Sequence, residues 1–298
     1  MEMGMKILLL GGQGQLATDL AAELRARGHE LHIRSHAELD IGNAREVAAQ
    51  VSACQPACVI NAAAFTQVEQ CEAEPERAYA VNAVGASNVA NAAQASGARC
   101  VYFSTDYVFG GPRGQPWRET DTPQPLNQYG KSKLAGEAMA AVNPRHFILR
   151  VSGLYGLAGS RGKGGNFVEA MLRRAQSGEP IAVVNDQILA PTYTAHLAPA
   201  VADLIVTSQY GLYHLSAAGE CSWFEFAREL FRQAKLEPQL RPVSSTEYGS
   251  PVRRPAYSVL DNTKYLGLGL TPIPDWRRGL SDYLALRRNR GTGTPCGS

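Results

Sequence analysis

The sequence lacks the features that would place it in several special classes. Its six cysteines (54, 58, 71, 100, 221 and 296) form no CxxC pair, and no His or Cys near Cys54 and Cys58 completes a zinc-binding set. We therefore expect reduced thiols, as in a cytoplasmic protein, and no metal site or disulfide framework. No apolar run approaches the roughly 20 residues of a membrane span. Ile7–Leu10 is too short an apolar core for a signal peptide.

The chain also lacks an excess of charge of either sign. Its 29 basic and 27 acidic residues give a net charge of +2, which argues against a nucleic-acid-binding surface. The hydrophobic fraction of 45% is typical of a globular protein and excludes a disordered one. A length of 298 residues fits one large domain or two ordinary ones.

What is present in the first half is a regular alternation of apolar runs and amphipathic segments. Strands are predicted over Lys6–Leu10, Glu30–Arg34, Cys58–Asn61, Cys100–Ser104 and His146–Arg150. Helices are predicted between them over Gln15–Arg27, Asn43–Ala53, Pro75–Ser96 and Gln128–Ala141. Strands that alternate with helices of this length predict an α/β fold, a Rossmann-like doubly wound parallel sheet with helices on both faces.

The alternation becomes irregular after Val151, and this predicts a second, smaller α/β region that binds substrate. We predict helices over Asn166–Gln176, Thr194–Val206 and Trp223–Ala234, with a short strand at Ile181–Val184. Loops are expected at Gly156–Gly165, which has five glycines, and at Pro238–Pro255. The chain after about residue 287 is expected to be frayed. The predicted parts are thus 1–152, which binds the cofactor, and 153–298.

A glycine-rich turn follows the first predicted strand. Gly11 and Gly14 stand where such a turn needs positive φ and where the backbone must approach a pyrophosphate, and Ala17 allows close packing of helix on strand. The helix N-terminus would then face the phosphates. Arg34 ends the second strand and favours NADP(H) over NAD(H), because an arginine there accommodates a 2′-phosphate. Asp40 and Ile41 follow in a loop where an adenine could lie; a plain tight turn and a surface arginine are the alternatives.

Tyr129 and Lys133 form a Y-x-x-x-K pattern on a predicted helix. At a spacing of four residues they share one helical face, so the ammonium would lower the pKa of the phenol toward the working pH, as an acid/base for a carbonyl–alcohol pair requires. Thr105 directly follows the fourth predicted strand, and its hydroxyl could hold a substrate carbonyl beside Tyr129. These three residues are the predicted catalytic set.

Taken together, these motifs resemble the extended short-chain dehydrogenase/reductases, and within them the dTDP-4-dehydrorhamnose reductase family. The resemblance rests on the glycine turn, Asn61–Thr66, Ser104–Phe109 and the Tyr129/Lys133 pair. Further matches cover nearly the whole chain, from about residue 5 to 285: Glu72–Pro75, Glu119–Asp121, Pro125–Asn127, Asn166–Val168, Asn185–Gln187, Pro191–Thr192, Tyr213–Leu215, Trp223 and Arg254–Pro255.

The resemblance implies reduction of the C4 keto group of dTDP-4-dehydro-6-deoxy-L-mannose to dTDP-L-rhamnose with NADPH, or alternatively NADH, in nucleotide-sugar and lipopolysaccharide O-antigen biosynthesis. Tyr129 would donate the proton, Lys133 would bind the nicotinamide ribose, and Thr105 would bind the sugar oxygen. The implied cofactor-binding residues are Gly11, Gly14, Gln15, Leu16, Arg34, Asp40, Ile41, Ala63, Ala64, Phe65, Thr66, Tyr129 and Lys133. The implied substrate-binding residues are Thr105, Asp106, Tyr107, Gly153 and Asn166.

Two departures from the family pattern leave alternatives open. Gly153 stands where many members carry a tryptophan that packs on the sugar, and Leu189 stands where smaller residues are common. The two could compensate each other or mark a different 4-keto sugar. The family's Mg²⁺-linked homodimer is also implied, but its acidic ligands cannot be placed in this C-terminal tail. An epimerase or dehydratase is disfavoured because Thr105-Asp106 lacks the dehydratases' Asp-Glu pair, and the intact catalytic set argues against a non-catalytic regulatory subunit.

Overall fold

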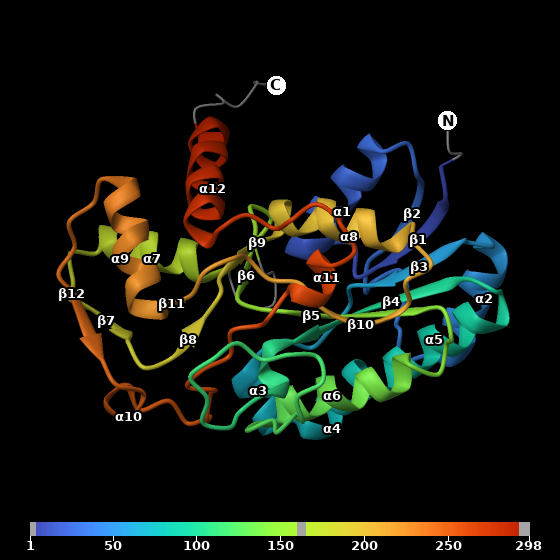
Figure 1. Ribbon diagram of the computed structural model, residues 1–298, viewed down its shortest axis with the longest axis horizontal. Coiled ribbons are helices and arrows are strands. Elements are labelled where there is room, and N and C mark those ends of the chain that lie inside the picture. Colours follow the sequence, from blue (N-terminus) through green and yellow to red (C-terminus); the bar gives the residue numbers. More distant parts are fainter. Residues whose placement is uncertain (1–3, 160–164, 292–298) are drawn as a thin grey trace.

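A six-stranded parallel sheet forms the centre of the molecule in a computed structural model, which describes residues 4–159 and 165–291 (Figure 1). Its strand order is β10-β5-β4-β3-β1-β2. The strands are β1 (Lys6–Leu10), β2 (Glu30–Arg34), β3 (Cys58–Asn61), β4 (Arg99–Thr105), β5 (His146–Val151) and β10 (Gly211–His214). All neighbours in this sheet pair in parallel. The predicted Rossmann-like fold is confirmed; the sixth strand, β10, was not predicted.

Helices cover both faces of this sheet because its strands are apolar on both sides. Ile7–Leu10 in β1 are at most 1% exposed. Figure 1 shows α1 (Gln15–Ala26) and α8 (Thr194–Ile205) above the sheet, and α5 (Gly85–Ala95) and α6 (Gln128–Ala140) below it, with α2 (Ala44–Cys54) beside α5. The helix predicted over Pro75–Ser96 consists of α4 (Pro75–Tyr79), a π-helical segment η1 (Ala80–Val84) and α5. The short helix α3 (Val68–Ala73) precedes it and was not predicted.

A smaller α/β region lies beside the carboxyl ends of the large sheet's strands. Its helices are α7 (Phe167–Gln176), α9 (Trp223–Ala234) and α10 (Ser245–Tyr248). Three two-stranded ladders join β6 (Leu154–Tyr155) to β9 (Thr192–Tyr193), β7 (Ile181–Val184) to β12 (Leu240–Val243), and β8 (Ile188–Leu189) to β11 (Cys221–Ser222). Figure 1 shows α7 and α9 grouped with these strands. Helix α11 (Thr263–Leu266) lies against β10, and α12 (Trp276–Gly291) rises beside α9.

Two loop predictions are wrong in part. Pro238–Pro255 contains β12 and α10, because β12 pairs along β7 despite its proline. Helix α12 runs through Gly291, beyond the end expected near residue 287, and Arg287 forms an ion pair with Glu169. Residues 160–164 of the predicted glycine-rich loop and 292–298 of the tail lie outside the described residues.

The division at residue 152 stays a prediction, because β10 and α8 come from beyond it and complete the layers around the large sheet. Within residues 4–159 and 165–291, no helix is long and apolar enough to cross a membrane.

Candidate active site

The turn after β1 is shaped by close contact with the segment after β3. Gly11 has φ +75°, and a methyl group on it would lie 2.6 Å from the backbone nitrogen of Ala63. Gly14 is the N-cap of α1 with φ −73°, so the turn takes its positive φ at Gly11. Among residues 4–159 and 165–291, no side chain caps α1, and no acidic residue lies in its first turn. This helix end therefore presents backbone N–H groups and a positive dipole end without a built-in anion.

Gln15 and Leu16 face other parts of the protein with their side chains. The Gln15 amide donates to the Leu154 carbonyl (3.0 Å) and accepts from the Gly156 N–H (3.1 Å), so it fastens α1 to the segment around β6. Leu16 is buried in the main core. Any contact of Leu16 with a pyrophosphate would thus come from its backbone.

At the end of β2, Arg34 is held beside the glycine turn. Its Nε donates to Gln50 (3.0 Å), and its carbonyl accepts from the Gly12 N–H (3.0 Å). Asp40 is exposed and accepts from the Gly42 N–H (2.9 Å). Ile41 is buried in the core against Gly85, whose added methyl would lie 2.7 Å from its Cδ1. Its side chain therefore has a packing role.

The segment after β3 is fixed by a residue that the sequence analysis missed. Asn82, buried in the π-helical segment, accepts from the Phe65 N–H (2.9 Å) and donates to the Phe65 carbonyl (3.0 Å) and to Ser132 (3.0 Å). The signal available in the sequence was a polar residue inside an alanine-rich helix. Phe65 packs with Cys71, Ala78 and Tyr129 in a small cluster. This cluster joins the predicted cofactor-binding segment to α6.

The start of α6 brings Tyr129 against the end of β4. Asn127 caps the helix by accepting from the Gly130 N–H (2.9 Å). A methyl on Gly130 would lie 2.2 Å from the Tyr107 carbonyl, so only glycine permits this approach. The rings of Tyr107 and Tyr129 meet edge to face at 5.6 Å.

The pKa of Tyr129 contradicts the expectation that Lys133 lowers it. Burial raises the pKa of the phenol, and the charge of Asp106 also raises it. Desolvation of a phenolate thus decides the direction of the shift, and Lys133, one turn away, does not reverse it.

Lys133 is itself buried, with an exposed fraction of 2%. Its Nζ lies 4.1 Å from the Tyr102 ring centroid, and burial lowers its pKa from 10.5 to about 7, although Glu137 opposes this shift. Tyr129, Lys133 and Glu137 follow at four-residue intervals on α6, so they share one face of the helix.

Glu137 belongs to a buried ion pair that the sequence analysis missed. Its carboxylate accepts from Arg150 Nη2 (2.7 Å), Arg150 Nε (2.8 Å) and the Ser104 hydroxyl (2.5 Å). Arg150 also stacks on Phe109. Burial lowers the pKa of His214 to about 3, and the nearby charge of Arg150 acts in the same direction. This network ties α6 to β4 and β5 directly behind Lys133.

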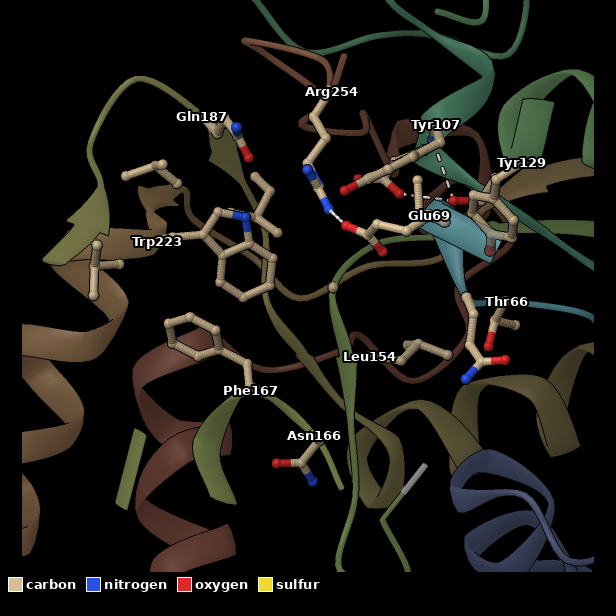
Figure 2. Close-up of a pocket in the computed structure, with 18 of the residues that line it drawn as sticks. Thr66, Glu69, Tyr107, Tyr129, Leu154, Asn166, Phe167, Gln187, Trp223 and Arg254 are labelled. Atoms are coloured by element: carbon tan, nitrogen blue, oxygen red, sulfur yellow. Dashed lines mark hydrogen bonds and ion pairs between the residues drawn. The ribbon is translucent and has the colours of Figure 1, made fainter. Parts of the chain in front are cut away.

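A cavity of about 720 Å³ opens over Thr105, Tyr107 and Tyr129 and extends into the smaller region (Figure 2). This volume suits a ligand of drug to cofactor size. Gly153, Asn166 and Thr66 also line it, as predicted residues of the site. Lining residues that the sequence analysis did not single out as ligand contacts include Gln187, Leu189, Phe167, Arg174, Trp223 and Arg254.

The far end of the cavity has an aromatic wall. The rings of Phe167 and Trp223 lie 4.5 Å apart and come from α7 and α9 (Figure 2). Nearer Tyr107, Arg254 forms an ion pair with Glu69 of α3. The cavity therefore offers an acid/base tyrosine at one end, an arginine in between and stacking surfaces at the other.

Gly153 has φ +53° and faces Leu189 across the cavity wall. A methyl on Gly153 would lie 2.9 Å from Leu189 Cδ1 and 3.1 Å from Pro191 Cα. Leu189 thus takes the space beside Gly153 that a larger side chain would need.

Asn166 is buried as the N-cap of α7. Its Oδ1 accepts from the Glu169 N–H (3.0 Å), and its Nδ2 donates to the Gly156 carbonyl (2.9 Å). The described residues contain no group of three or more His, Cys, Asp or Glu side chains that could hold a metal.

This fold and site define a class: an NAD(P)H-dependent oxidoreductase with a Rossmann fold and a Tyr–Lys pair at the carboxyl end of its sheet. Comparison with known proteins makes the assignment narrower. The RmlD substrate binding domain model matches residues 5–288. The spore coat polysaccharide biosynthesis protein SpsK of Bacillus subtilis is 41% identical over 283 residues, covering 95% of this chain and 98% of SpsK.

Two further relatives carry the name of a single activity. The dTDP-4-dehydrorhamnose reductase of Escherichia coli K12 is 38% identical over 295 residues, covering 94% of this chain and 97% of the relative. The crystal structure of the Bacillus anthracis dTDP-4-dehydrorhamnose reductase in complex with NADP superposes with a TM-score of 0.90 at 40% identity, covering 95% of this chain and all of that one. The chain therefore belongs to the dTDP-4-dehydrorhamnose reductase family.

Proposed function

We propose that this protein reduces the C4 keto group of dTDP-4-dehydro-6-deoxy-L-mannose with NADPH, giving dTDP-L-rhamnose. The observation that carries the proposal is the placement of Thr105 and Tyr129 at one end of a cavity that both parts of the chain line. Lys133 follows one turn later, and family membership supports the substrate class.

NADPH is proposed because the residues present fit it. The N-terminus of α1, which no described side chain caps, suits a pyrophosphate. Gly11 has no side chain, so its backbone packs closely on that of Ala63 beside this helix end. Arg34 lies next to this turn and provides a cation for a 2′-phosphate. The Bacillus anthracis relative was crystallised with NADP. When bound, the reduced nicotinamide supplies a hydride.

In the proposed mechanism, each catalytic side chain has one task. Thr105 and Tyr129 bind the keto oxygen of the sugar, and Tyr129 gives its phenolic proton to the alkoxide that develops there. Burial keeps Tyr129 protonated, which is the form a reduction needs. Lys133 binds the ribose and, once charged, stabilises the phenolate left behind. The sugar gains a hydride and a proton, so the carbonyl becomes a secondary alcohol.

The rest of the cavity would hold the nucleotide part of the substrate. Arg254 and Arg174 provide positive charge for a diphosphate, and Phe167 and Trp223 provide a stacking surface for a base. The Asn166 side chain caps α7, so this residue would bound the nucleotide site as part of the cavity wall.

A second candidate is reduction of another nucleotide-linked 4-keto sugar. The observation that favours this candidate is the pair Gly153 and Leu189. Together they give the cavity wall a branched aliphatic surface where many family members have an indole. Losing an aromatic wall changes contact energies by about 1–3 kcal/mol, enough to alter the choice of sugar.

The test follows NADPH absorbance with a panel of dTDP-4-keto-6-deoxy sugars, and identifies each product by NMR. The proposal predicts fastest turnover with dTDP-4-dehydro-6-deoxy-L-mannose and a product with the rhamno configuration at C4. Faster turnover of another sugar would support the second candidate. An epimerised keto sugar with no net NADPH loss would indicate an epimerase, and binding of NADPH without turnover of any sugar would indicate a regulatory subunit. The same assay compares the Tyr129→Phe variant, which removes the proposed proton donor, with Tyr79→Phe on α4 as the matched control.

The remaining expectations from the sequence are also proposals: residues 1–152 as the part that binds NADP(H), a cytoplasmic location, and a homodimer. The dimer has a candidate surface in exposed apolar residues below the large sheet, namely Tyr79 and Val84 before α5, and Met139 and Val142 at the end of α6 and just after it. Light scattering of the purified protein with and without Mg²⁺ tests the dimer and any role of the metal in it.

A further inference from the structure

The last residue of β2, Arg34, points to the face of the large sheet that α2 covers. Side chains alternate between the two faces along a strand. Ile33 packs with the main core on the side of α1, and its Cγ2 fills the space that a methyl on Gly12 would need. Arg34 therefore faces the other way, and its Nε donates to Oε1 of Gln50 on α2 (3.0 Å).

The guanidinium of Arg34 is held at one edge and leaves its outer end available. An arginine side chain has five N–H groups. The Nε–H binds Gln50, and one Nη1–H donates to the Ile33 carbonyl (2.9 Å). Within residues 4–159 and 165–291, these two are the hydrogen bonds of the Arg34 side chain. The remaining N–H groups lie on Nη1 and Nη2, where a ligand with several oxygens can accept them.

The charge of Arg34 has no carboxylate partner in the described parts of the chain. Arg113 pairs with Asp121 (2.8 Å), and the buried Arg150 pairs with Glu137 (2.7 Å). Arg34 forms no such ion pair there, although it is half-buried. Glu38, in the turn after β2, instead accepts from the Ser35 N–H (2.8 Å) and hydroxyl (2.7 Å).

The neutral amide of Gln50 therefore has a particular effect on its partner. An amide oxygen holds a guanidinium in a fixed direction without cancelling its charge, whereas a carboxylate would do both. The place also matters, because the Gly12 N–H donates to the Arg34 carbonyl (3.0 Å) and sets this residue beside the glycine turn. In a Rossmann fold, the end of the second strand lies next to the adenosine ribose of a bound dinucleotide.

We propose that Gln50 is a positioning residue for cofactor choice: it holds the Arg34 guanidinium toward the 2′-phosphate of NADPH and leaves its charge uncompensated. Gln50 can do this only if Arg34 binds that phosphate, so the inference rests on the proposed function. Gln50 itself has no contact with the cofactor in this account. The local sequence does not reveal the pair, because its members are 16 residues apart on different elements.

Two substitutions separate direction from charge. Gln50→Glu keeps the length of the side chain and places a carboxylate against Nε, so Arg34 gains an ion pair and a phosphate meets a negative charge. Gln50→Met also keeps the length, but it removes the acceptor and adds no charge. Arg34 then stays cationic and loses its fixed direction. Preference for NADPH should therefore fall in the order wild type, Gln50→Met, Gln50→Glu.

The experiment measures kcat/KM for NADPH and for NADH with dTDP-4-dehydro-6-deoxy-L-mannose. NADH is the internal reference, because a general folding defect lowers both values and leaves their ratio unchanged. We expect the NADPH/NADH ratio to fall about tenfold in Gln50→Glu and about threefold in Gln50→Met.

Ala49→Glu is the matched control, because it adds the same charge at the exposed neighbouring position of α2, on another side of the helix. Its ratio should stay within about twofold of wild type, since exposed charges are screened. An unchanged ratio in Gln50→Glu, or an equal fall in Ala49→Glu, would overturn the proposal.

A second measurement separates this inference from the proposed function. Calorimetry compares the affinities for adenosine 2′,5′-bisphosphate and adenosine 5′-monophosphate, which differ in the 2′-phosphate, in the absence of any sugar. We expect wild type to bind the bisphosphate more tightly, Arg34→Ala to lose this advantage and Gln50→Glu to lose most of it. That result supports the role of Gln50 even if no keto sugar is turned over.

Two other results of this measurement count against the proposal. If Arg34→Ala loses the advantage and Gln50→Glu keeps it, Arg34 binds the 2′-phosphate without help from Gln50, and the inference alone is refuted. If both variants keep it, Arg34 has no role in binding the 2′-phosphate, and the inference is refuted even in an active reductase.

Discussion

Replacing Lys133 by methionine should make the substrate-free protein more stable while it abolishes turnover. Lys133 is buried over the Tyr102 ring, and burial lowers its pKa from 10.5 to about 7. In the unfolded chain the same ammonium is solvated and keeps its ordinary pKa. Folding at neutral pH therefore carries a cost that a methionine of similar length does not have.

The magnitude and its pH dependence follow from linkage. At about 1.36 kcal/mol per pH unit, the gap between 10.5 and about 7 corresponds to about 5 kcal/mol, and the contact with Tyr102 suggests that the real gain is nearer about 2–4 kcal/mol. Above pH 10.5 both states are neutral and the cost vanishes. As pH falls toward 7, only the unfolded state takes up a proton, so stability is lost progressively; below about 7 the loss is complete.

Thermal unfolding at several pH values measures this directly. For a chain of this size, about 2–4 °C per kcal/mol predicts a Tm for Lys133→Met that is higher by about 5–10 °C near pH 7, with a gain that shrinks toward pH 10. Lys131→Met, at an exposed position on the same helix, is the control and should change Tm little. A Tm for Lys133→Met at or below that of wild type at neutral pH, or a gain independent of pH, would refute the reasoning.

Three further predictions concern the acid, the cofactor and the buried ion pair. Tyr129→Phe should lower kcat at least about a hundredfold with NADPH affinity retained; full activity would show that the proton comes from elsewhere. Arg34→Ala should reduce the preference for NADPH over NADH about tenfold in kcat/KM, and an unchanged ratio defeats the role of Arg34. Glu137→Gln should cost about 3–5 kcal/mol in denaturant unfolding by leaving Arg150 unpaired, and adding Arg150→Met should recover most of it; no recovery would contradict the ion-pair account.

Most of the large sheet could be predicted from the sequence because its strands are continuous apolar runs. Lys6–Leu10 is one such strand, and its bounds agree with the structure. β10 could not be found in this way, because its four residues become a strand only by pairing with the edge of β5. β12 was missed because a proline interrupts it, although its pairing with β7 tolerates that proline at the edge of a two-stranded ladder.

The candidate site was predictable where a motif sets local geometry. The four-residue spacing of Tyr129 and Lys133 requires a shared helical face whatever surrounds it. The sign of the Tyr129 pKa shift was not predictable, because burial decides it and burial depends on Phe65, Cys71 and the end of β4. The orientation of Asp106 depends on Ser152 and Ser258, which lie 46 and 152 residues away in the chain, and no local sequence pattern links them to it.

The central claim, that this chain moves a hydride to C4 of a dTDP-linked 4-keto sugar and a proton from Tyr129 to its oxygen, is tested most directly with NADPH deuterated at C4 of the nicotinamide. After incubation with dTDP-4-dehydro-6-deoxy-L-mannose, the account predicts dTDP-L-rhamnose with deuterium at C4 of the sugar, and no such product from Tyr129→Phe on the same time scale. With both C4 hydrogens of NADPH replaced by deuterium, a product that lacks deuterium at C4 of the sugar, or carries it at another sugar carbon, would contradict it.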